Sequence, residues 1–380
     1  MSKEYEAIIV GGGVIGGAIA YNLAKRGKKV LLLEKDRLAS QASSAAAGML
    51  AAQAELSGCG QLFPLAKESR RMFPFLEEEI KKVSGVDIQL VNKGTLKPAL
   101  TEAEEIACKQ SIEKYQEAGE QADWLTAEQA KKLEPNLSCA VRGAMYIKKD
   151  GHVSAPHLTR GFLYAAAVLG ADIFEYEEVL SLQQQGGEIT GVNTSKSSYL
   201  SPNVIIAGGA WSDKLLKETE APLNTYPVKG ECFSLLIQKP LLSYTIFSDG
   251  CYLVPKSGGR IIVGATVKQN TFDRTVTMKG IYSLMDKAKS LVPVIINAEL
   301  EKAWAGIRPQ TADALPYLGE HPALEGLFVA TGHYRNGILL SPITGEVMAD
   351  LVEKKTTGVD LTPFRLERNN MTSVGNGGSI

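Results

Sequence analysis

Several features that would define a protein class at once are missing from this sequence of 380 residues. No apolar run reaches the length of about 18 residues that a membrane-spanning helix needs. The 41 basic and 42 acidic residues almost balance, so no basic face for nucleic acid is expected. The five cysteines are widely spaced without a CxxC, and the four histidines lack ligand spacing, which argues against a disulfide framework or a metal site. No signal-peptide pattern is evident, so a cytoplasmic protein without a membrane partner is predicted.

The composition is that of an ordinary globular protein, with 44% apolar and 22% charged residues. A single hydrophobic core rarely grows beyond about 250–300 residues. The chain is therefore predicted to form two domains.

The first motif is a glycine turn between a short apolar run and a helical pattern, IIVGGGVIGGAIAYNLAKRGKKVLLLEKD at residues 8–36. In a strand–turn–helix unit of this kind, Gly11 allows the turn, Gly13 lets a pyrophosphate approach, and Gly16 lets the helix pack on the strand. Glu34 ends the next strand, 18 residues after Gly16, where an acid accepts hydrogen bonds from an adenosine ribose. An acid there disfavours NADP, but the motif does not distinguish NAD from FAD.

Strand–glycine–helix patterns recur near residues 205 and 330, and strand-rich sequence lies between them. This order predicts an α/β protein, α+β overall. Its Rossmann-like cofactor domain would be built from discontinuous segments, and its second domain would hold a mainly antiparallel sheet. The predicted cofactor domain comprises residues 1–85, 150–220 and 305–365. The predicted substrate domain comprises residues 86–149 and 221–304, and residues 366–380 form a polar tail that is expected to be disordered.

The stretch SQASSAAAGML at residues 40–50 follows the first unit directly. Its composition alone predicts no more than the start of a helix, capped by Ser43 or Ser44.

Four stretches give the chain a family resemblance: VGGGVIGGAIAYNLA with LLLEK, SSAAAGM, AGGAWS, and GIRPQTADALPYLG with TGHYRNGILLSPITG. In this order they resemble the D-amino acid oxidase and sarcosine oxidase group of flavoproteins. YPVKGEC and CYLVPKSG are most similar to the members that oxidise glycine and supply the thiazole of thiamine.

The resemblance implies FAD as the cofactor, bound without a covalent link because no cysteine stands where some relatives attach the flavin. The cofactor-binding residues that it implies come from five parts of the chain: Gly11, Gly13, Val14, Ile15 and Gly16; Glu34 and Lys35; Ala42, Ser43, Ala47, Gly48 and Met49; Val179; and His333, Tyr334, Arg335, Asn336, Gly337, Ile338 and Leu339. A helix that begins near Gly337 would direct N–H groups at the flavin edge, where negative charge develops on reduction.

The same resemblance implies an amino acid substrate whose carboxylate is held by arginine, since the planar guanidinium matches a carboxylate with two donors. Arg308, Tyr252 and Arg335 are the predicted catalytic and substrate-binding residues, and Met49 and Ala51 are predicted to line the substrate site. The implied reaction is the oxidation of glycine by O₂ to glyoxylate, ammonia and H₂O₂, and it requires alignment more than a general base. A homotetramer is implied by the resemblance alone.

Other substrates and other classes stay open at this point. Ala51, Phe247, Gly250 and Val267 depart from the residues common in similar proteins, so sarcosine and small D-amino acids are alternative substrates. A quinone-linked D-amino acid dehydrogenase is the alternative enzyme. A flavin-binding protein without turnover would not need Arg308 and Tyr252.

Overall fold

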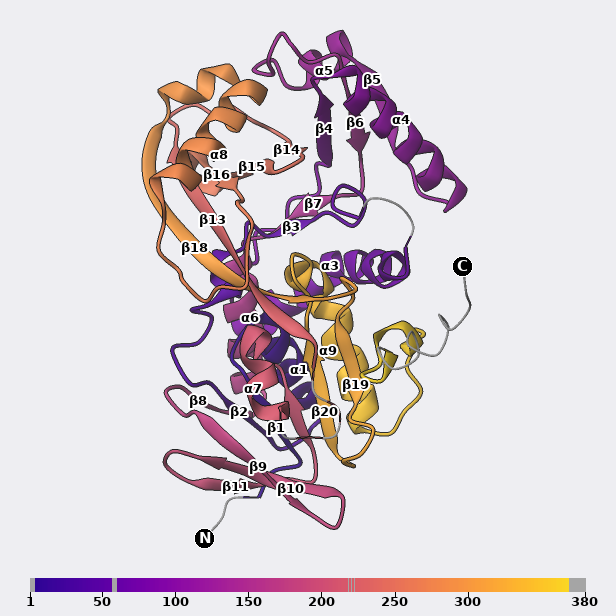
Figure 1. Ribbon diagram of the computed structural model, residues 1–380, viewed down its shortest axis with the longest axis vertical. Coiled ribbons are helices and arrows are strands. Elements are labelled where there is room, and N and C mark those ends of the chain that lie inside the picture. The colour runs from indigo at the N-terminus through magenta and orange to yellow at the C-terminus, as the bar shows by residue number, and fades with distance from the viewer. Residues whose placement is uncertain (1–3, 57–59, 218, 220, 222, 369–380) are drawn as a thin grey trace, which may run out of the picture.

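The computed structural model describes residues 4–56, 60–217, 219, 221 and 223–368. It has two parts (Figure 1): one is built around a largely parallel sheet with helices, and the other around a large mixed sheet. Residues 369–380 of the predicted tail lie outside the described residues, and residues 366–368 are ordered, with Leu366 buried.

The six-stranded sheet has the order β19–β20–β12–β1–β2–β8, and its strands are parallel except for β19. Their bounds are β1 Ala7–Val10, β2 Val30–Leu33, β8 Asp172–Phe174, β12 Val204–Ile206, β19 Tyr317–Glu320 and β20 Leu327–Thr331. All six come from the three segments that were predicted to converge. Their continuous apolar runs are typical of parallel strands that are buried on both faces. The predicted Rossmann-like α/β fold is confirmed.

Four helices cover this sheet and one another: α1 Val14–Lys25, α3 Leu62–Ser84, α6 Ala155–Val168 and α9 Gly337–Val352. Helix α1 packs against both α9 and α6, and α3 packs against the same two helices. Small residues allow α1 and α9 to approach each other closely. A Cβ at Gly345 of α9 would lie 2.6 Å from the carbonyl oxygen of Ala18 in α1. Helix α9 begins at Gly337 and packs against α1, which begins at Val14.

The second part is a nine-stranded mixed sheet in which β13 and β18 form the longest pair. Its strands are β4 Thr95–Ala99, β5 Asp123–Thr126, β6 Gly143–Ile147, β13 Thr225–Leu236, β14 Thr245–Ser248, β15 Cys251–Lys256, β16 Arg260–Gly264, β17 Lys268–Gln269 and β18 Glu299–Thr311. Helices α4 Glu102–Glu117, α5 Ala127–Leu133 and α8 Met278–Leu291 lie against it (Figure 1). All neighbouring strands are antiparallel except β14 and β4, which are parallel.

The remaining elements are short or peripheral. They are helices α2 Ala42–Ala45 and α7 Ser212–Leu216, strands β3 Met49–Leu50, β7 Gly151–His152, β9 Val179–Gln185, β10 Glu188–Thr194 and β11 Ser198–Leu200, and the 3₁₀ turns Gly209–Trp211, Ser257–Gly259, Pro293–Asn297 and Thr362–Phe364. The pair β3–β7 joins Met49 to His152 and so links the segment after α2 to the start of α6.

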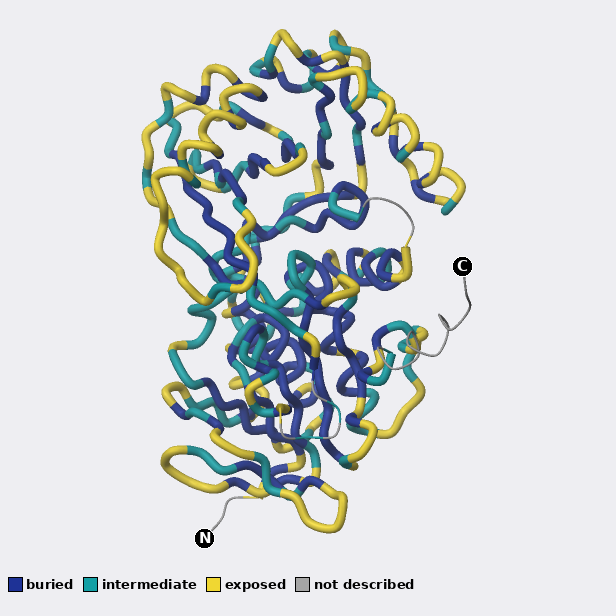
Figure 2. Tube along the Cα trace, in the orientation of Figure 1, coloured by how far each residue is buried: buried dark blue, intermediate teal, exposed yellow. Residues whose placement is uncertain are grey.

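Buried residues are concentrated in the parallel sheet and its helices, whereas many residues of the second part remain exposed (Figure 2). Each part has its own apolar cluster. One surrounds Ile9, Ile19 and Leu340, and the other surrounds Leu96, Leu253 and Leu291.

Two local features are not marked by the sequence. Strand β4 begins only at Thr95, because Gln89 and Gly94 adopt positive φ angles that interrupt an extended strand. Strand β18 was not predicted, and the boundary proposed at residue 305 falls within it.

Candidate functional site

The glycine turn after β1 is shaped by close backbone contacts. Gly11 has φ +119°, and a Cβ there would lie 2.5 Å from the carbonyl oxygen of Ala207. A Cβ at Gly16 would collide with the carbonyl oxygen of Gly11. At Gly13 a Cβ would meet only Ser43 Oγ, at 3.1 Å. Gly11 and Gly16 thus let the turn form, while Gly13 keeps the N-terminus of α1 open.

Composition predicted that Ser43 or Ser44 caps the helix in this stretch, but neither side chain does so. Helix α2 begins after Gln41 without a side-chain cap, and Ser43 Oγ accepts a hydrogen bond of 2.9 Å from the N–H of Val14. Ser43 therefore fixes the α2 segment against the first turn of α1.

Glu34 is buried at the end of β2 and its carboxylate already binds the backbone. One oxygen accepts from the N–H of Gly12 at 2.7 Å, and the other accepts from the N–H of Asp36 at 2.9 Å. A carboxylate offers about four lone-pair sites, so two remain for further donors. Glu34 thus stabilises the glycine turn and still faces the cavity beside it.

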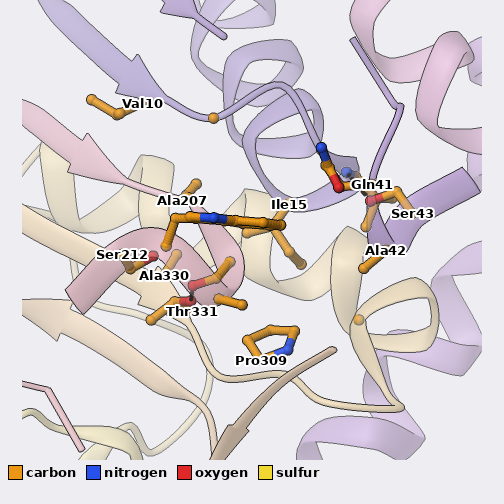
Figure 3. A pocket seen from close by; sticks show the side chains of 18 of the residues that line it. Val10, Ile15, Gln41, Ala42, Ser43, Ala207, Ser212, Pro309, Ala330 and Thr331 are labelled. Atoms are coloured by element: carbon orange, nitrogen blue, oxygen red, sulfur yellow. Dashed lines mark hydrogen bonds between the residues drawn. The ribbon is translucent and has the colours of Figure 1, made fainter. Parts of the chain in front are cut away.

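One elongated cavity begins at this turn and runs to the N-terminus of α9. Figure 3 shows its walls, with Ile15 of α1, Ala42 and Ser43 of α2, Ala207 after β12, and Ala330 and Thr331 of β20 around the same space. Of the predicted cofactor-binding residues, the cavity is lined by Gly11, Gly13, Val14, Ile15, Glu34, Lys35, Ala42, Ser43, Val179, His333, Tyr334, Arg335, Gly337 and Ile338. Gly16, Asn336 and Leu339 are not among its lining residues.

Sequence reasoning missed part of this wall. Trp211, Ser212, Pro309 and Thr331 also line the cavity, and Lys35 Nζ lies 4.1 Å from the centre of the Trp211 ring. Of these residues, Trp211 and Ser212 lie in AGGAWS, one of the stretches that carry the family resemblance. Ser212 Oγ is buried without a hydrogen-bond partner in the described part of the chain. An unpaired buried hydroxyl is costly, so this oxygen indicates a polar ligand in the cavity.

These walls fit FAD by their own chemistry. Two helix N-termini, of α1 and α9, face the same cavity, and such termini favour phosphate and other negatively charged groups. Glu34 at one end offers acceptors for ribose hydroxyls, and small residues leave room between the two. FAD would be held at the glycine turn, at Glu34 and Ser43, and along the start of α9.

A second, smaller cavity adjoins the first and shares Ala42, Ala46, Tyr334, Arg335 and Ile338 with it. It also contains five further residues predicted for the cofactor or substrate site, Ala47, Gly48, Met49, Tyr252 and Arg308. Ala51 is buried against the same apolar cluster as Ala47 and Tyr252 but is not among the lining residues. Phe247, Gly250 and Val267 are also absent from the lining, and the side chain of Val267 is exposed.

Arg308 lies on β18 at the wall of this cavity. Its guanidinium lies against Gly230 of β13, where any Cβ would collide with it. It donates to the carbonyl oxygen of Thr266 at 3.3 Å and lies 5.9 Å from the ring centre of Tyr334. No carboxylate pairs with Arg308 among the residues described, so most of its five donors are available to an anion.

Arg335 differs because it is already paired. Its Nε and Nη2 donate to the two carboxylate oxygens of Glu55, at 2.8 and 3.0 Å. Glu55 raises the pKa of Arg335 further above its ordinary value. Glu55 was not predicted as a site residue, because nothing in AAQAELSG marks it. Within this cavity, Arg308 is the cation whose charge is not neutralised by the protein.

Tyr252 is buried, and its hydroxyl lies 3.4 Å from Cys232 Sγ. Burial raises the pKa of Tyr252 well above its ordinary value. The hydroxyl therefore stays protonated at neutral pH and can donate a hydrogen bond to an anion in the cavity.

His333 is also buried, and its Nε2 lies 3.2 Å from Thr344 Oγ1. Burial lowers the pKa of His333 to about 3. The imidazole is therefore neutral at physiological pH, which argues for a packing role rather than for proton transfer.

Other kinds of site are not found among the described residues. No group of histidine, cysteine and carboxylate side chains there could hold a metal ion. Cys108, Cys139, Cys232 and Cys251 are free thiols, and Cys59 lies outside the described residues. None of the helices described is long and apolar enough to cross a membrane.

Comparison with known proteins gives one consistent result. A family model described as DAO, FAD dependent oxidoreductase, matches residues 6–351. A glycine oxidase of Geobacillus kaustophilus (strain HTA426) is 49% identical over 97% of this chain and 98% of its own length. The crystal structure of glycine oxidase from that organism covers 97% of this chain and 99% of its own, with a TM-score of 0.94. The Bifunctional protein ThiO/ThiG of Synechocystis sp. is 34% identical over 93% of this chain and 52% of its own.

Proposed function

The chain belongs to the DAO family of FAD-dependent oxidoreductases, and from this premise we propose that it oxidises glycine with O₂ to glyoxylate, ammonia and H₂O₂. As a member of this family it is an enzyme whose cofactor is FAD rather than NAD. The observation that carries the choice of substrate is the small cavity with one unpaired arginine, beside the cofactor cavity. The glycine oxidase relatives support the same choice.

In this proposal Arg308 binds the substrate carboxylate with two parallel hydrogen bonds. The protonated Tyr252 hydroxyl donates a third, since both groups line the same cavity. Ala47, Gly48 and Gly306 also line this cavity, and its volume of about 70 Å³ suits a substrate with a small side chain or none. FAD, when bound, supplies the redox chemistry by accepting a hydride from the substrate α-carbon and passing the electrons to O₂.

The protein contributes alignment and not a base. Tyr252 keeps its proton because of burial, His333 stays neutral, and Glu55 is committed to Arg335. The substrate amine must therefore react in its neutral form. Holding the α-carbon in a fixed position is the main catalytic effect of the chain's own residues.

Further parts of the proposal extend beyond the site. We place the cofactor domain in residues 1–85, 150–220 and 305–365 and the substrate domain in residues 86–149 and 221–304. We also propose a cytoplasmic homotetramer with non-covalent FAD, and that the imine product serves the thiazole of thiamine. The motif resemblance and the similarity to the ThiO/ThiG protein support this last assignment.

Anaerobic mixing of the purified holoenzyme with glycine tests the main proposal. Loss of the oxidised flavin absorbance and formation of glyoxylate are expected, with sarcosine and D-alanine ranked in the same assay. A flavin that stays oxidised in glycine but is reduced by D-alanine would replace the proposal by a D-amino acid oxidase. Acid precipitation of the holoenzyme should release the yellow cofactor into the supernatant, because no covalent link is expected.

A further inference from the structure

A third cavity lies behind the segment that covers the substrate cavity. Ala45, Ala46 and Ala47 line both spaces, so this segment separates them. The third cavity has a volume of about 630 Å³, within the usual range for small-molecule sites. It plays no part in the reaction proposed above.

Its walls carry one sign of charge. Arg160 of α6, Lys256 of β15, Arg260 of β16 and Lys302 of β18 all line it, and none of its described lining residues is acidic. Arg260 is neutralised by Glu301, with Nε and Nη2 at 2.6 and 2.5 Å from its oxygens. Among the described residues, no carboxylate is hydrogen-bonded to Arg160, Lys256 or Lys302. Three cations without a hydrogen-bonded carboxylate thus face one cavity, which concentrates anions there.

Lys256 is the most informative of the three. Its ammonium donates to the carbonyl oxygen of Val153 at 2.8 Å and lies 3.1 Å from His152 Nδ1. Both partners are neutral, because burial lowers the pKa of His152 to about 2. Burial also lowers the pKa of Lys256, to about 7. A buried ammonium without a counter-ion is unfavourable, and an anion in the cavity would relieve that cost.

A second observation is independent of these charges. Ser40 also lines this cavity, and its hydroxyl oxygen is buried without a hydrogen-bond partner in the described part of the chain. The Ser40 hydroxyl can donate a hydrogen bond to an anion, and so can the Arg160 guanidinium and the ammonium groups of Lys256 and Lys302. Donors and positive charge therefore coincide at one place that the cofactor and substrate cavities do not use.

We propose that this cavity is a second ligand site, separate from the active site, for a small molecule that carries phosphate or diphosphate. Three cations without a hydrogen-bonded carboxylate match the two or three negative charges of such a group better than they match a monocarboxylate. The Arg160 guanidinium provides planar donors, and the lysines provide point charges, both of which are common in phosphate sites.

Calorimetric titration of pyrophosphate into FAD-saturated holoenzyme tests the proposal, because bound FAD excludes pyrophosphate from the cofactor cavity. Saturable binding at one site per chain is expected when ionic strength is held constant with sodium chloride. In R160Q/K302Q, which changes two exposed side chains, affinity should fall at least about tenfold. The matched control K82Q/K132Q removes the same charge from exposed positions elsewhere and should bind as the unmodified protein does.

A third variant, Lys256→Met, keeps a side chain of similar length but removes the buried charge. It should also lose pyrophosphate binding. Absence of saturable binding, or equal affinity in R160Q/K302Q and in the unmodified protein, would overturn the proposal. Tighter binding of malonate than of pyrophosphate would overturn the phosphate assignment in favour of a dicarboxylate. No amino acid substrate is present in these titrations, so their outcome is independent of whether glycine is oxidised.

Discussion

Replacing Arg308 by lysine tests whether the unpaired guanidinium orients the substrate. Lysine keeps the positive charge but loses the planar pair of donors. It also loses the flat surface that lies on Gly230 and faces Tyr334. No described carboxylate pairs with the Arg308 guanidinium, so the substitution leaves no buried carboxylate without a partner. Its effect should therefore fall on substrate binding and alignment.

The expected loss follows from the contacts that disappear. A charge-assisted hydrogen bond contributes about 1.5–3 kcal/mol, and a misplaced α-carbon slows the reaction further. We expect transition-state binding to weaken by about 2–4 kcal/mol, which lowers kcat/KM for glycine by roughly 30- to 1000-fold. Anaerobic stopped-flow reduction at varied glycine concentration separates the loss of orientation from the loss of attraction. Loss of orientation lowers the limiting rate of flavin reduction, whereas loss of attraction raises the half-saturating glycine concentration.

The control is Arg142→Lys, the same change at an exposed arginine of the second part that pairs with Glu105 at 2.9 Å. FAD affinity should be close to normal in both variants. If the Arg308 variant is reduced at the unmodified rate and half-saturation, Arg308 does not hold the carboxylate. Arg335 would then be the candidate, which requires its release from Glu55.

Three further results are expected. Glu34→Ala should weaken FAD binding at least about tenfold and also lower apoprotein stability by about 1–3 kcal/mol, because Gly12 and Asp36 lose their acceptors; unchanged FAD affinity on titration would show that only the turn depends on Glu34. Tyr252→Phe should raise half-saturation for glycine about tenfold or more without changing FAD affinity, and a change in FAD affinity alone would contradict a role in substrate binding. His333 has a folded-state pKa of about 3, below its usual value, so its contribution to stability is present above about pH 6.5 and is lost as pH falls towards 3. His333→Asn should therefore reduce the loss of stability between about pH 6.5 and 4 in urea denaturation, and an unchanged slope would show that His333 is accessible to protons.

The cofactor half of the fold was predictable because its signals are local. Helix α1 and strand β2 lie within the predicted strand–turn–helix–strand unit at residues 8–36, and strand β20 lies near residue 330 as predicted, since apolar runs, helical spacing and glycine all agree there. Most of the predicted site residues line two adjoining cavities, and their roles remain predictions until the variants above are measured. Strand β18 was missed because ELEKAWAGIRPQT is charged and contains proline. Its strand conformation comes from pairing with β13, which no local pattern reports.

Charge pairing was the least predictable feature, and it decides what the site can bind. The near balance of 41 basic and 42 acidic residues gives no hint that Arg308 is unpaired while Arg335 is neutralised. Arg335 and Glu55 are 280 positions apart in sequence, so only the fold brings them together. Among the described residues, the proposed substrate cavity therefore offers one unpaired cation to one carboxylate. The cavity behind the Ala45–Ala47 segment offers three cations drawn from three separate elements, which suits a ligand of higher charge. Two different anion preferences therefore arise on opposite sides of one short segment in a chain whose net charge is almost zero.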